Sequence, residues 1–105
     1  MLTSEVMRRA KEVLSEEGWQ QGAYSADWHR GPFCVYGALI EACGAWQRQH
    51  VITVHTQVLT DVLYVNWGIG CIEGWNDVPG RTFDQVIDAL DRAEKRALIA
   101  EEALG

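Results

Sequence analysis

Three cysteines and three histidines are the residues of this 105-residue chain that are best suited to chemistry. Structural zinc sites usually take their ligands as closely spaced pairs of cysteines or histidines. His50 and His55, with four residues between them, have such a spacing, but no close cysteine pair accompanies them. We therefore expect no metal and no cofactor, and interpret the histidines as solvent-facing or helix-end residues. The full set is Cys34, Cys43, Cys71, His29, His50 and His55.

A cysteine beside a histidine would form a different kind of site, because an imidazole can activate a thiol as a nucleophile. The pairing that the chain offers is Cys34 with His29 or His55, and no flanking motif supports it. Cys34 and Cys43 both fall in an apolar segment, where cysteine usually behaves as a small buried hydrophobic residue. We expect no catalytic residues, and a non-enzymatic role is favoured over an enzyme.

The octet from Trp75 to Thr82 is the most information-dense part of the chain. Its proline–glycine pair predicts a turn, and Thr82 with Gln85 has the spacing of a capping box at a helix start. A helix start attracts anions, so Asp77 and Arg81 could hold a polar ligand beside Trp75. The alternative, which we favour, is that both charged side chains only fix the loop.

Five tryptophans are a high count for a chain of this length. They cannot all fit inside a small core, and tryptophan is enriched at binding surfaces. We expect most of them to pack in the core or to anchor loops. Trp28 and Trp67 are the candidates for contact with a partner.

Charge and hydropathy exclude several classes of function. The formal net charge is −6 and no run of lysine and arginine offsets it. Binding of nucleic acid needs a basic surface, and anionic membranes also repel an acidic protein. The start of the chain lacks the pattern of a signal peptide, and no apolar run is long enough to span a membrane. We expect no nucleic-acid partner, no membrane partner and a cytoplasmic location.

The elements that must position these residues are mainly helices. Apolar spacing predicts a first helix over Ser4–Glu17 with Thr3 as its N-cap, then a loop over Gln20–Pro32. A second helix over Phe33–Gln49 is apolar on nearly all sides, which is typical of a buried central helix.

The second half of the chain is less clearly patterned up to the octet. Residues 51–56 could be a short strand or a linker, and residues 56–66 favour a helix with a strand as the alternative. A glycine-rich connector is predicted over Trp67–Gly74. The last helix covers Phe83–Leu104, and we expect its end, from Ala97, to project past the core. The prediction is a single all-α domain of about four helices over residues 1–105.

The chain resembles an actinobacterial and mycobacteriophage family with a W-N-D-x-P-G-R-T motif and no established activity. The resemblance rests on Gly18-Trp19, on Cys34 followed by Gly37-Ala38-Leu39, and above all on Trp75-Asn76-Asp77 with Pro79-Gly80-Arg81-Thr82. It spans most of residues 4–95. It implies a small intracellular bacterial or phage protein without a known catalytic residue, and a phage member would be an accessory protein that acts on host factors.

Three functional hypotheses follow. The first is a non-enzymatic protein-interaction module that modulates a host protein, with contacts at Trp28, at Trp67 and on the exposed side of the last helix. The second is a small-molecule binding protein or minor enzyme, with a pocket near Trp75, Asp77, Arg81 and His55. The third is a homodimer built on the last helix.

Overall fold

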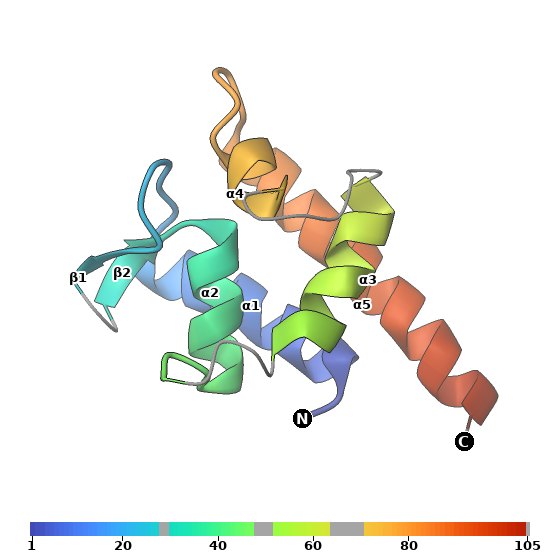
Figure 1. Ribbon diagram of the computed structural model, residues 1–105. Coiled ribbons are helices and arrows are strands. Elements are labelled where there is room, and N and C mark those ends of the chain that lie inside the picture. The colour runs from blue at the N-terminus through green and yellow to red at the C-terminus, as the bar shows by residue number, and fades with distance from the viewer. Residues whose placement is uncertain (28–29, 48–51, 64–70, 105) are drawn as a thin grey trace.

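The computed structural model describes residues 1–27, 30–47, 52–63 and 71–104 (Figure 1). Two of the predicted contact residues, Trp28 and Trp67, lie outside these ranges, as do His29 and His50. The predictions for these four side chains therefore stay predictions.

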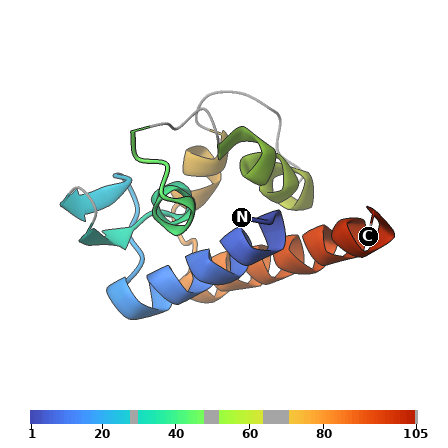
Figure 2. The ribbon, with the colours of Figure 1, turned by 90° about the horizontal axis from the view of Figure 1, so that it is seen from below.

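The described residues form five helices and one small antiparallel hairpin, so the all-α class is confirmed with one helix more than expected. Helices α1 (Thr3–Glu17) and α5 (Phe83–Leu104) lie side by side and run in opposite directions (Figure 2). Helices α2 (Val35–Cys43), α3 (Thr53–Leu63) and α4 (Cys71–Asn76) form a second layer over them. No helix within the described ranges is both long and apolar enough to cross a bilayer.

One hydrophobic core lies between the two layers. Burial of apolar side chains contributes roughly 25 cal/mol per Å² of surface removed from water, so this core is the main stabilising feature. α2 is the element buried on most sides, as its apolar sequence predicts. The largest fully buried side chains are Phe33, Met7, Leu14, Leu39, Ile40, Ile52, Leu59 and Leu90.

Strands β1 (Ser25–Asp27) and β2 (Arg30–Phe33) form the hairpin where the sequence predicted only a loop. β2 also pairs with the segment after α1, because the Phe33 amide donates to the Gly18 carbonyl at 3.0 Å and the Gln20 amide donates to the Phe33 carbonyl at 2.9 Å. Phe33 is thereby an extended residue. The predicted start of the second helix at Phe33 is wrong for this reason.

α2 is also shorter than predicted at its other end. Gly44 adopts φ +68°, a left-handed conformation that ends helices. The helix therefore stops at Cys43 rather than at Gln49.

The remaining boundaries differ less. α1 begins at Thr3, so the prediction of Thr3 as its N-cap is wrong. Leu2 holds the cap position, and its amide donates to Glu5 Oε1 at 2.9 Å. Residues 53–63 are helical, so the strand alternative is wrong there. Part of the predicted connector, from Cys71, is the short helix α4.

Candidate functional site

Asn76, the second residue of the octet, is fully buried, and its side chain uses all of its hydrogen-bonding capacity. Its Oδ1 accepts from the Trp19 indole N–H at 2.7 Å and from the Val35 amide at 3.0 Å. Its Nδ2 donates to the Gln20 carbonyl at 3.1 Å and to Asp77 Oδ1 at 2.9 Å. One amide side chain thus joins the ends of α1, α2 and α4, and it has no free donor or acceptor for a ligand.

The residues beside Asn76 complete the same connection. Asp77 Oδ1 accepts from the Gly22 amide at 2.9 Å. In the other direction, Gln21 Nε2 donates to the carbonyls of Asn76 and Val78, at 3.0 Å each. The Asp77 carboxylate therefore holds the segment after α1 in place, which agrees with the favoured interpretation of this residue.

Arg81 is held at the start of α5 by two contacts with Trp75. Its Nε donates to the Trp75 carbonyl at 2.9 Å, and its guanidinium carbon lies 4.0 Å from the centre of the Trp75 ring. A cation over an indole face is an attractive contact. Behind this pair, Thr82 and Gln85 exchange the two bonds of the predicted capping box, at 3.0 and 3.2 Å.

A shallow depression of about 360 Å³ opens beside the octet. It contains two of the predicted binding residues, Trp75 and Arg81, but not Asp77. His55 is not part of it either, because its Nδ1 lies 2.9 Å from Thr3 Oγ1 at the start of α1. The lining residues are Trp75, Arg81, Asp84, Gln85, Asp88 and Arg92.

The described tryptophans behave as the composition predicts. Trp19, Trp46 and Trp75 are each half-buried and pack against the core. The indole N–H of Trp46 donates to Glu41 Oε1 at 2.7 Å, as that of Trp19 does to Asn76. These three side chains are anchors of the fold.

Cys34 has a structural role at the start of α2. Its Sγ accepts from the Gly37 amide at 3.3 Å, which caps the helix. Burial raises the pKa of the Cys34 thiol to about 11, although the bond from Gly37 acts in the opposite direction. The thiolate is the nucleophilic form, and a raised pKa keeps Cys34 in the thiol form at neutral pH. Burial also raises the pKa of Cys43.

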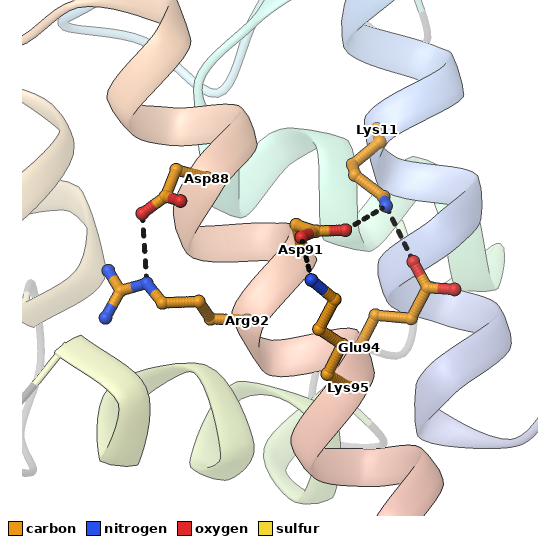
Figure 3. Close-up of polar contacts among 6 residues, drawn as sticks. All are labelled: Lys11, Asp88, Asp91, Arg92, Glu94 and Lys95. Atoms are coloured by element: carbon orange, nitrogen blue, oxygen red, sulfur yellow. Dashed lines mark hydrogen bonds and ion pairs between the residues drawn. The ribbon is translucent and has the colours of Figure 1, made fainter.

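One lysine of α1 joins that helix to two carboxylates of α5 (Figure 3). Lys11 of α1 reaches Asp91 at 3.2 Å and Glu94 at 2.7 Å. Burial alone would lower the pKa of Lys11, but the carboxylates of Glu94 and Asp91 outweigh it and raise that pKa. On α5 itself, Lys95 pairs with Asp91 and Arg92 pairs with Asp88, both at 3.0 Å.

A second surface lies where α1 begins and α5 ends. The sequence predicted a contact on the exposed side of the last helix, without a more precise place. Glu101 of α5 accepts from the amide of Ser4 at 3.1 Å and from the Ser4 hydroxyl, so it caps α1. Leu2 and Leu98, 55% and 41% exposed, line a depression of about 260 Å³ beside this contact. We call this the terminal surface; it is lined by Leu2, Ser4, Glu5, Arg8, Glu94, Leu98 and Glu101.

Comparison with curated proteins and with solved structures finds no match. A family model covers nearly the whole chain, from residue 1 to residue 96, and so includes the octet and most of α5. The chain belongs to the family of unknown function DUF6197.

Proposed function

We propose that this protein is a protein-interaction module of bacterial or phage origin, which binds and modulates a host protein through its terminal surface. The observation that carries the proposal is the pair of exposed leucines in a depression, Leu2 and Leu98. Large apolar side chains that line a concave surface together are typical of interaction sites. The octet, in contrast, directs its side chains mainly to internal contacts.

The charge of the terminal surface specifies the chemistry of the partner. Three carboxylates, from Glu5, Glu94 and Glu101, line it with one guanidinium, from Arg8. The whole chain, these residues included, has a formal net charge of −6. A partner segment that presents an apolar side chain flanked by lysine or arginine would fit, because opposite potentials steer association and disfavour acidic competitors.

The test is an affinity pull-down of the tagged protein from an actinobacterial lysate, read by mass spectrometry. Leu98→Glu places a charge in the terminal surface, and Val78→Glu is the matched control because Val78 is 43% exposed in the octet. We expect one dominant partner that is retained by the wild type and the control and lost with Leu98→Glu. Direct binding to that purified partner should weaken as salt rises.

Two results would contradict the proposal. One is the absence of any partner above background from a folded sample. The other is a partner that binds Leu98→Glu as well as the wild type. In the second case, parallel baits with Trp28→Ala and Trp67→Ala would test the two contacts predicted from sequence.

A small-molecule site is the second candidate, supported by the depression beside Trp75 and Arg81. Its guanidinium groups, from Arg81 and Arg92, would suit an anionic metabolite stacked near the indole. A ligand that binds the native state raises the melting temperature by mass action. A rise with one metabolite of a metabolite and metal panel, lost in Arg92→Ala, would favour this function over the first.

A further inference from the structure

We propose that the outer side of α5 binds the same helix of a second copy of this chain, in an antiparallel arrangement centred on Ile99. We call this the self-association surface; it comprises Arg92, Lys95, Arg96, Ile99 and Glu102. It is distinct from the terminal surface, which lies on the α1 side of the helix. The inference does not depend on the proposed function.

The first observation is the exposure of Ile99. This side chain is 70% exposed on the α3 side of α5, two residues beyond Ala97, the last buried position of the helix. It lines a depression of about 320 Å³ together with Val62 of α3. Two apolar side chains therefore line this depression, and its other lining residues are the three basic side chains Arg92, Lys95 and Arg96.

The second observation concerns the charged side chains around Ile99, of which some are paired within α5 and two are not. Lys95 forms an ion pair with Asp91 and Arg92 forms one with Asp88, both within α5. The Asp88–Arg92 pair lies on the side of the helix away from α1 (Figure 3). Within the part of the chain that the structure describes, Arg96 and Glu102 have no ion pair. Both are exposed on the same stretch of helix as Ile99.

The third observation is the order of these charges along the helix. The basic side chains Lys95 and Arg96 come one turn before Ile99, and Glu102 comes one turn after it. With a rise of 1.5 Å per residue, each lies roughly 5 Å from Ile99 along the axis. A two-fold axis that passes beside Ile99 therefore places the basic turn of one copy opposite the acidic turn of the other, twice.

This symmetry is what selects a second copy as the occupant. A surface with an apolar centre, a basic turn on one side and an acidic turn on the other is complementary to itself when it is inverted. Ala103, on the same side of the helix as Ile99 and exposed, is small enough to let the two backbones approach. Such a contact is small for a protein interface, so we expect a weak dimer.

Charge-exchange variants test the proposal. In Glu102→Lys, a lysine faces Lys95 and Arg96 of the other copy, and in Arg96→Glu one basic partner is replaced by an acid. An equal mixture of the two variants restores attraction, because the new lysine then meets the new glutamate. Asp84→Lys, the same charge change in the first turn of α5 and outside the surface, is the matched control.

Sedimentation velocity from micromolar to millimolar concentration gives the readout. We expect the mass of the wild type and of Asp84→Lys to rise from 11.8 kDa toward twice that value. Glu102→Lys should raise the dimer Kd at least about tenfold, the effect of roughly 1.4 kcal/mol, and the mixture should associate more tightly than either variant alone. A monomer at millimolar concentration, equal association of all variants, or loss of the dimer in Asp84→Lys would overturn the proposal. The pull-down with Leu98→Glu is read separately, so failure of one proposal does not decide the other.

Discussion

The two ends of the molecule use their polar and apolar residues in opposite ways. At the end that contains the octet, Asn76 is fully buried and every hydrogen bond that it can make is made within the fold. At the end where α1 begins and α5 finishes, Leu2 and Leu98 are exposed around a depression. Figure 1 shows the loop after α4 and the two chain termini on opposite sides of the molecule.

The difference shows that a distinctive sequence motif need not be a binding site. The octet connects three segments far apart in sequence, since Asn76 contacts Trp19 and Val35 directly. A buried connection of this kind requires particular residue types because an unpaired buried polar group costs about 1–3 kcal/mol. Exposed leucines at the other end carry no such requirement for folding.

The largest expected effect comes from Gly37→Ala, which adds a methyl group at the octet end. An ideal Cβ there would overlap the carbonyl oxygen of Tyr24, which belongs to the backbone and cannot rotate away. We expect a loss of more than about 4 kcal/mol in the free energy of unfolding, or failure to fold. Urea denaturation measures it. Gly74→Ala is the control, because nothing lies within 4 Å of its Cβ position, and an equal loss there would contradict the steric explanation.

Asn76→Ala should have the next largest effect. It removes the acceptor of the Trp19 indole and of the Val35 amide in a buried place. We expect a loss of about 3 kcal/mol, measured by chemical denaturation. The exposed Gln21 donates to two carbonyls of the same loop, so Gln21→Ala should cost clearly less. If the two variants lost equal free energies of unfolding, burial of the Asn76 side chain would not be the reason for its effect.

Thr82→Ala should destabilise the protein by about 1 kcal/mol, the usual contribution of an N-cap side chain. It removes the bond from the Gln85 amide to Thr82 Oγ1. Thr82→Ser keeps that hydroxyl and is the control. Thermal denaturation of the three proteins would show whether the cap holds the octet; no difference would show that tertiary contacts alone do so.

At the other end, the half-buried His55 predicts a pH dependence of stability. Burial, and then the positive charge of the N-terminal amine, lower the pKa of His55 in the folded protein. The unfolded chain therefore binds more protons, and the free energy of unfolding should fall as pH drops below about 6.5. His55→Gln removes this titration. The free energy of unfolding is measured for both proteins between about pH 7 and pH 5. If it falls as steeply in His55→Gln as in the wild type, His55 is not the cause.

Leu98→Glu should have the smallest effect on stability, within about 0.5 kcal/mol, because the side chain is already 41% exposed. Its melting temperature should equal that of Val78→Glu. A clear loss of stability would show that Leu98 belongs to the core and would remove the contrast between the two ends.

Most of the helices could be predicted from the sequence because they depend on neighbouring residues. α5 spans Phe83–Leu104, the predicted range, and Thr82 with Gln85 forms the predicted box. The buried character of α2 likewise follows from its apolar composition. Periodicity and capping act within a few residues, so a single sequence contains them.

The tertiary structure alone decided the roles of the polar residues. Asn76 is hydrogen-bonded to Trp19, which is 57 positions away in the chain. His55 contacts Thr3, which is 52 positions away. The hairpin likewise escaped prediction, because Phe33 is extended by its bonds to Gly18 and Gln20 and not by its own propensity. Residue type and spacing limit which groups can bond, but which groups meet depends on how the helices pack. The sequence by itself therefore determined most of the helices, while the packing decided that Asn76 is a buried connection and that the exposed leucines gather at the opposite end.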